Sequence, residues 1–200
     1  MKWLSYAASG LYLSILFSCS SDDAPPPLEN EEEVITTVTL TFEPEGGGET
    51  VTASWEDADG EGAGVPVVDN IILAPDTEYT LSITLTNAID PDSPEDITEE
   101  VRTEADEHMF FFGWTEGLMA DPSGDGNIDD RADPVNYEDS DGTLPLGLIT
   151  RWTTEVPATG VPATGTFRLL LKHQPDIKSA TSTSGNGETD VNIEWEMTIQ

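Results

Sequence analysis

The strongest constraint on the fold of this chain is a hydrophobic pattern that repeats at every second residue. Between Val191 and Ile199 every odd-numbered residue is apolar and every even-numbered residue is polar. The same alternation runs through four earlier segments, residues 34–42, 51–55, 79–85 and 167–173. Because successive side chains of a β-strand point to opposite faces, this period predicts antiparallel strands that each bury one face.

Three further apolar runs, residues 67–73, 108–114 and 146–154, bring the expected number of strands to about eight. Residues 93–108 break the pattern, with Ser93 as the expected N-cap and Pro94 as the first helical residue. An apolar stripe with helical spacing follows, formed by Ile97, Val101 and Ala105. We therefore expect an all-β fold, an antiparallel immunoglobulin-like β-sandwich of about eight strands with one short crossover helix.

The N-terminus has the features of a secretory signal peptide over residues 1–18. Lys2 precedes an apolar run that is too short to span a bilayer. The run ends at Leu16-Phe17-Ser18-Cys19, which resembles a bacterial lipobox, and Cys19 is the single cysteine of the chain. The resemblance implies that Cys19 is acylated and becomes the mature N-terminus. A secreted protein with one stray cysteine is the alternative.

The residues after Cys19 form an acidic, proline-rich linker that extends to residue 33, so we expect a single β-sandwich domain over residues 34–200. The linker begins with Ser20-Ser21-Asp22-Asp23, which resembles the export signal of surface lipoproteins of Bacteroidota. The resemblance implies a lipid anchor in the outer membrane, with the domain at the cell surface. The periplasmic face is the alternative.

The charge of the chain is strongly negative, with 40 acidic residues against 7 basic ones and a net charge of −33. Such a surface repels phosphate groups, so nucleic acid is excluded as a partner. Mutual repulsion favours a soluble monomer. The same charge attracts cations.

One acidic loop, residues 121–133, resembles the calcium-binding loop of an EF-hand. Its oxygen donors are spaced at alternate positions, as a calcium ion with six to eight oxygen ligands requires. The candidate ligands are Asp121, Ser123, Asp125, Asn127, Asp129 and Asp133. The loop departs from the motif at Ala132, which stands where the bidentate glutamate belongs. Calcium is therefore the expected metal, if the protein has one.

Two other loops carry a weaker form of this signal, an Asp-x-Asp-Gly sequence. Their candidate calcium ligands are Asp57, Asp59 and Glu61 in the first loop and Asp139 and Asp141 in the second. Asp-Gly is also a favoured turn dipeptide, because glycine accepts a positive φ. A plain turn explains both loops equally well.

The two histidines, His108 and His173, are a separate candidate. His173 continues the alternation of the apolar residues before it, which favours a buried, hydrogen-bonded histidine. A zinc or copper site of both histidines with Glu104 or Glu107 is the alternative.

Motifs that carry catalysis are missing from the sequence. It has no H-E-x-x-H, G-x-S-x-G or phosphate-binding glycine loop, so we expect no enzyme and name no catalytic residue. A tryptophan beside an acidic loop, Trp114 or Trp152, is the expected place for glycan stacking.

Four stretches resemble small acidic lipoproteins of Bacteroidota: "NEEEVITTVTLTF", "DITEEVRTEADEHMFFF", "LLLKHQPD" and "NGETDVNIEWEMTIQ". Some of these proteins are labelled as type 1 periplasmic binding folds, an α/β class that one helix among many strands contradicts. The resemblance implies the surface location and no known activity. We expect a lipid-anchored binding or structural module, stabilised by calcium. A solute- or glycan-capture lipoprotein of an uptake system is the alternative, and a hydrolase without a recognisable motif comes third.

Overall fold

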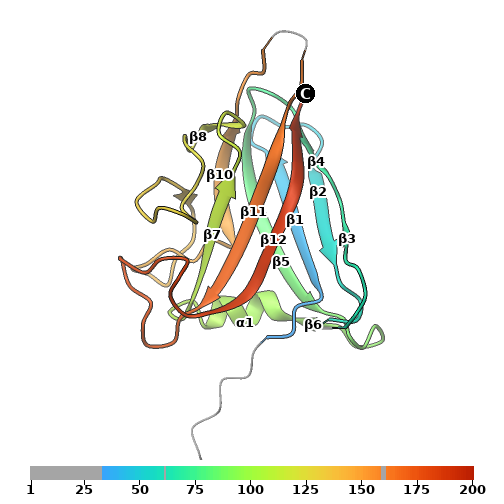
Figure 1. Ribbon diagram of the computed structural model, residues 1–200, viewed down its shortest axis with the longest axis vertical. Coiled ribbons are helices and arrows are strands. Elements are labelled where there is room, and N and C mark those ends of the chain that lie inside the picture. The colour runs from blue at the N-terminus through green and yellow to red at the C-terminus, as the bar shows by residue number, and fades with distance from the viewer. Residues whose placement is uncertain (1–32, 61, 159–160) are drawn as a thin grey trace, which may run out of the picture. The chain divides into compact units, whose positions relative to one another are not determined.

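Two mainly antiparallel sheets pack face to face in the computed structural model, which describes residues 33–60, 62–158 and 161–200 (Figure 1). The first sheet contains β1 (Thr37–Pro44), β2 (Val51–Glu56), β3 (Val67–Val68), β5 (Glu78–Asn87), β6 (Glu95–Asp96), β8 (Met119–Asp121), β9 (Asn136–Tyr137) and β10 (Ile149–Thr154). The second contains β4 (Ile71–Leu73), β7 (His108–Trp114), β11 (Ala163–His173) and β12 (Glu188–Ile199). The predicted all-β sandwich is confirmed.

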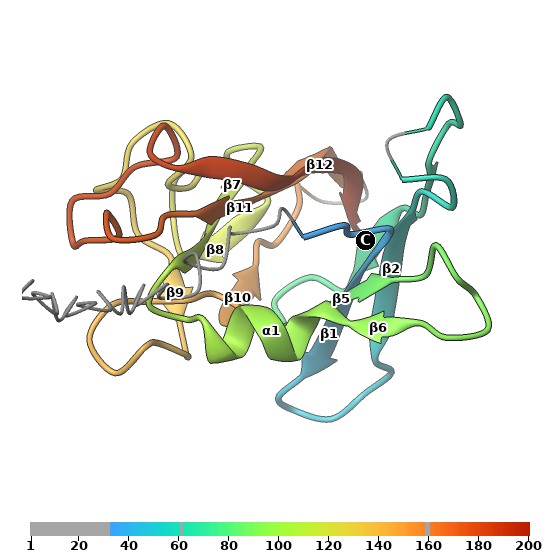
Figure 2. The same ribbon diagram turned by 90° about the horizontal axis from the view of Figure 1, so that it is seen from below.

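The strands of each sheet follow an order different from that of the sequence. The first sheet runs β3-β2-β1-β5-β10-β8, with β6 beside β5 and β9 beside β10. The second runs β4-β12-β11-β7, and β4 lies parallel to β12. The helix α1 (Ile97–Thr103) lies across one end of the sandwich, here called the base (Figure 2). The chain terminus at Gln200 lies at the opposite end (Figure 1).

The core lies between the sheets and is formed by the apolar residues of the alternating pattern. In β12 the odd-numbered residues Val191 to Ile199 are all buried, as their period predicts. The centre of the core is aromatic, and the Trp152 ring makes edge-to-face contacts with Trp114 at 5.0 Å and Phe167 at 5.3 Å between ring centroids. Trp114 and Trp152 are therefore core residues rather than exposed stacking platforms.

Two strands occupy residues 67–73, where the sequence predicted one. β3 pairs with β2 in the first sheet, whereas β4 pairs with β12 in the second. Between them, Asp69 accepts hydrogen bonds from the backbone N–H and the hydroxyl of Ser54, each at 2.9 Å. These bonds tie the chain to β2 just before it crosses to the other sheet.

The helix begins three residues later than the sequence predicts. Its N-cap is Asp96, which accepts a hydrogen bond from Thr98 N–H at 3.0 Å, and the predicted cap Ser93 lies outside it. Glu95 and Asp96 pair with the end of β5 instead. The predicted apolar stripe of Ile97, Val101 and Ala105 is buried against the sandwich, which confirms the amphipathic character of the segment.

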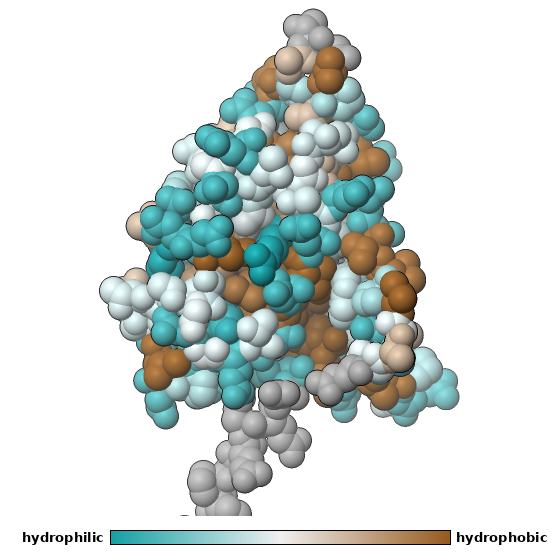
Figure 3. Space-filling model, in the orientation of Figure 1, coloured by the Kyte–Doolittle hydropathy of each residue, from teal (hydrophilic) through white to brown (hydrophobic). Residues whose placement is uncertain are grey.

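Hydrophilic side chains cover most of the face seen in Figure 3, and apolar ones gather toward the edge that carries β3. There Val67 and Val68 remain exposed, because β3 is a two-residue edge strand. Among the described residues no helix is long and apolar enough to cross a membrane.

Candidate functional site

The two histidines meet at the base of the sandwich, although 64 positions separate them along the chain. His108 is the first residue of β7 and His173 the last of β11, and the antiparallel register places them directly opposite each other. Their imidazole rings are stacked, with centroids 4.4 Å apart and planes inclined by 8°. This pair is the centre of a cluster of titratable groups.

Acidic side chains complete this group, here called the basal cluster: Glu33, Glu107, His108, His173 and Asp190. His108 Nε2 lies 3.2 Å from Glu33 Oε1 and 3.8 Å from Asp190 Oδ2. On the other ring, His173 Nε2 lies 3.1 Å from Glu107 Oε2. The cluster thus combines two imidazoles and three carboxylates.

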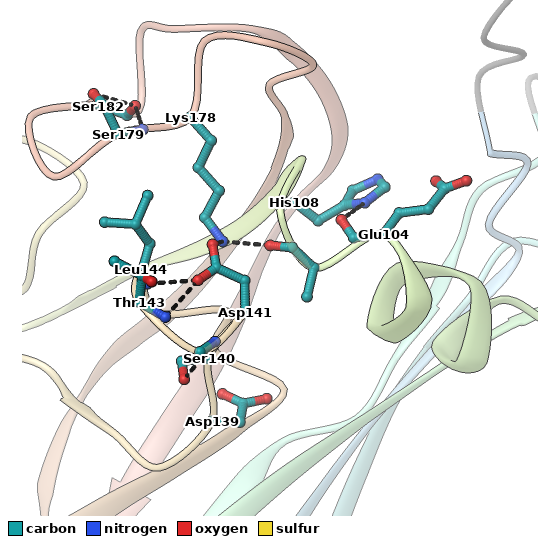
Figure 4. Close-up of polar contacts among 12 residues, drawn as sticks. Glu104, His108, Asp139, Ser140, Asp141, Thr143, Leu144, Lys178, Ser179 and Ser182 are labelled. Carbon is teal, nitrogen blue, oxygen red and sulfur yellow. Dashed lines mark hydrogen bonds and ion pairs between the residues drawn. The ribbon is translucent and has the colours of Figure 1, made fainter.

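The backbone fixes the orientation of His108. Its Nδ1 lies 3.2 Å from the carbonyl oxygen of Glu104, one turn earlier at the end of α1 (Figure 4). Because a carbonyl only accepts hydrogen bonds, Nδ1 carries the proton and donates it. In the neutral ring Nε2 therefore holds the lone pair, and it faces the carboxylates of Glu33 and Asp190.

The inner part of the cluster is buried and has polar atoms without hydrogen-bond partners. The side chains of His108, Asp190 and Glu33 are 0%, 2% and 5% exposed. Apart from the 3.2 Å ion-pair contact between His108 Nε2 and Glu33 Oε1, the atoms His108 Nε2, Glu33 Oε2 and Asp190 Oδ2 form no hydrogen bond. Buried polar atoms are almost always paired in native proteins, so the carboxylate oxygens without a partner on both sides of His108 indicate an unsatisfied binding capacity.

The charges of the cluster shift the pKa values of its members. Burial raises the pKa of Asp190, and the nearby charge of Glu33 raises it further, to about 6. Burial opposes the charged form of His108 too, but the contact with Glu33, the Glu104 carbonyl and the Asp190 charge together outweigh burial and raise the His108 pKa overall. His108 in turn lowers the pKa of Glu33 against the effect of burial. The cluster is therefore an environment that favours positive charge.

A pocket of about 230 Å³ adjoins the cluster. It is lined by Glu33, Val34, Ile35, Trp55, Gly60, Thr189 and Asp190. Since Glu33 and Asp190 belong to both the pocket and the cluster, the pocket reaches two of the carboxylates that surround His108. Trp55, which the sequence placed in the core, packs against the core but stays partly exposed at this pocket.

The loop that resembles an EF-hand lies along the outer edge of β7. Trp114 N–H donates to Asp125 O at 2.9 Å, and Asn127 N–H donates to Phe112 O at 2.8 Å. The Asn127 side chain is fully buried, accepting from Phe112 N–H and donating to the Tyr137 hydroxyl. This amide covers an otherwise open sheet edge.

The other candidate calcium ligands of this loop stay near the surface. Asp121, Ser123, Asp125 and Asp129 are exposed and Asp133 is half-buried, and Asp121 accepts a hydrogen bond from Asn136. Among the described residues, the three whose donor atoms come within 4.8 Å of one another are Glu33, His108 and His173, not members of the loop. Calcium binding by the loop stays a prediction.

The two weaker loops use their aspartates in hydrogen-bonded turns, and calcium binding by these loops stays a prediction. Asp141 accepts hydrogen bonds at 2.7 Å from two backbone N–H groups, those of Thr143 and Leu144, and pairs with Lys178 (Figure 4). Asp139 accepts from Gly147 N–H at 2.7 Å. In the first loop Asp57 O and Asp59 Oδ2 accept from Gly60 and Gly64. Glu61 and Cys19 lie outside the described residues.

Sequence reasoning found the histidine pair but missed two of its carboxylates. Glu33 lies at the end of the predicted linker, and Asp190 lies just before the alternating run that starts at Val191. Asp190 is the extra residue of a β-bulge, because Leu171 pairs with Val191 while Lys172 pairs with Thr189. Of the two predicted neighbours, Glu107 contributes its carboxylate and Glu104 contributes its carbonyl oxygen.

Comparisons with family models, curated proteins and solved structures found no match to this chain.

Proposed function

We propose that this protein is a lipid-anchored lipoprotein of the outer membrane, displayed at the cell surface, and that its binding element is the basal cluster. The observation that carries the proposal is the position of Glu33, the first described residue, whose carboxylate is buried against His108 and Asp190. A tether that begins at Cys19 therefore ends inside the candidate site.

The position of the site supports this arrangement. The described chain enters the sandwich at the base, and Gln200 lies at the far end (Figure 1). The negative surface repels neighbouring copies and nucleic acid, and it attracts cations toward the cluster.

Mass spectrometry of the protein purified from membranes tests the anchoring. We expect a mature chain that begins at Cys19 and carries acyl chains, together with labelling by an antibody applied to intact cells. Cys19→Ser is the control, and this variant should lose the acyl mass and leave the membrane fraction. A native chain with a free Cys19 thiol contradicts the proposal.

Capture of a glycan or other small solute is the second candidate function. The partly exposed Trp55 in the pocket beside Glu33 and Asp190 favours it, because an aromatic face with polar neighbours suits a sugar ring. Oligosaccharides should quench tryptophan fluorescence in the native chain and fail to do so in Trp55→Phe. Equal quenching of the native chain and of Trp55→Phe would show that Trp55 does not contact the sugar.

A further inference from the structure

We propose that the basal cluster is a zinc site, with His108, His173 and Glu33 as ligands and Asp190 as the fourth donor. The inference rests on the proposed role of the cluster as the binding element and names its ligand. Its basis is the convergence of one donor atom each from Glu33, His108 and His173, all within 4.8 Å of one another. Asp190 Oδ2 lies 3.8 Å from His108 Nε2, and this oxygen and Glu33 Oε2 are buried without a hydrogen-bond partner.

The donor types select the class of metal. Imidazole nitrogen with carboxylate oxygen is a ligand set that zinc accepts in four-coordinate sites, whereas calcium and magnesium take oxygen donors. The Nδ1 contact of His108 with the Glu104 carbonyl has the form of the outer-shell contacts that orient metal-binding histidines. A divalent ion also neutralises carboxylates that now lie close together in a buried space.

Zinc binding requires a local rearrangement of the stacked rings. Zinc holds nitrogen and oxygen ligands at about 2.0–2.2 Å, so donors up to 4.8 Å apart must move closer together. Parallel imidazoles direct their in-plane lone pairs side by side, and one ring must tilt for both to reach one ion. His173 is the ring that tilts, because its Nε2 contact is with Glu107, whose side chain is 34% exposed and can move aside.

The site has an entrance for the ion. The pocket of about 230 Å³ shares Glu33 and Asp190 with the cluster and opens to solvent beside Trp55. Lys172 pairs with Thr189 beside the bulge that contains Asp190, and its ammonium group donates a hydrogen bond to the Thr189 hydroxyl at 2.7 Å.

Isothermal titration of the full chain with zinc chloride, in the presence of excess magnesium, tests the proposal. The expected result is one tight equivalent of zinc. Asp190→Asn and Glu33→Gln keep the side-chain shape and remove a charged donor, and each should weaken zinc binding about 10- to 100-fold. Glu194→Gln removes an exposed carboxylate from the same strand as Asp190 and should leave the affinity unchanged.

Nuclear magnetic resonance of the native chain labelled with ¹⁵N-histidine gives a readout that needs no variant. The sequence has two histidines, so each ring nitrogen can be assigned. Zinc should shift Nε2 of His108 and one nitrogen of His173 while Nδ1 of His108 stays protonated. Unchanged ring signals at saturating zinc, or equal zinc affinity in Asp190→Asn and Glu194→Gln, would overturn the site and assign the binding to the acidic surface. If the native chain carries lipid but does not bind zinc, only the zinc site is overturned. If the chain binds zinc but carries no lipid, only the proposed anchoring is overturned.

Discussion

His108 and His173 stack across β7 and β11 with an angle of 8° between their ring planes. The pair brings together the end of the helical segment, the end of the longest hairpin of the second sheet and the entry of the chain into the sandwich. The two rings are buried, and carboxylates approach them from three separate segments. The base is thus where segments far apart in the sequence concentrate their charge.

Gly126 is expected to be intolerant of any side chain. Its φ is +98°, and an added Cβ would lie 2.1 Å from Phe112 O, so the loop would have to leave the edge of β7. Gly126→Ala should lower the free energy of unfolding by about 2–4 kcal/mol. Gly124 is a matched control, because it has the same φ of +98° with open space around it. Gly124→Ala should cost about 1 kcal/mol in urea denaturation, and equal losses in the two variants would contradict the close approach.

Trp152 is expected to dominate the stability of the core. It is fully buried, its ring meets Trp114, Phe112 and Phe167, and its Nε1–H donates to Thr150 Oγ1 at 2.7 Å. Trp152→Ala should lower the free energy of unfolding by about 3–5 kcal/mol. Trp55→Ala, at a partly exposed position, should cost clearly less in the same urea titration. A similar loss for both would mean that ring size alone, not packing, sets the cost.

Asp141 should contribute stability that depends on pH. Burial acts to raise its pKa, but the N–H groups of Leu144 and Thr143 and the Lys178 charge lower it below the ordinary 3.8. A carboxylate with a lowered folded pKa stabilises the fold above its unfolded pKa, and the contribution disappears as pH falls through the folded pKa. Asp141→Asn should therefore cost about 2 kcal/mol at neutral pH and progressively less between about pH 5 and pH 1.

Lys178, the ion-pair partner of Asp141, provides a control for the Asp141→Asn variant. The Lys178 side chain is 1% exposed, so Asp141→Asn leaves a buried ammonium group without its counter-charge. Adding Lys178→Met removes that charge, and the double variant should recover part of the loss at neutral pH. Urea midpoints measured along the pH series check both statements, and a penalty that is constant with pH would contradict them.

Calcium is expected to bind loop 121–133 through its exposed carboxylates. Saturation at ten times the dissociation constant would raise the melting temperature by about 3–6 °C over chelator-treated protein. Asp125→Asn and Asp129→Asn should reduce this shift, while Asp57→Asn, in a weaker loop, should leave it intact. Differential scanning calorimetry measures the shift. Identical melting temperatures with calcium and with chelator would contradict calcium binding by this loop.

The sequence by itself determined which face of the alternating strands enters the core, because a period of two places alternate side chains on one face of a strand wherever that strand pairs. The alternation from Val191 to Ile199 therefore predicted the buried face of β12, and the helical stripe of Val101 and its neighbours predicted α1. Which face of a strand is apolar is a local property of the sequence, and it does not depend on which strands lie beside it.

Only the tertiary structure decided which strands are neighbours and where the regular pattern is broken. The crossing of residues 67–73 between sheets and the capture of Glu95 and Asp96 by β5 depend on hydrogen-bond partners distant in the sequence. The candidate site follows the same rule. Asp190 reaches the histidines through a bulge, and Glu33 reaches them through the path of the chain into β1. Pairing between segments distant in the sequence sets both the order of the strands and the positions of these two carboxylates. A hydrophobic period within one segment carries no information about that pairing.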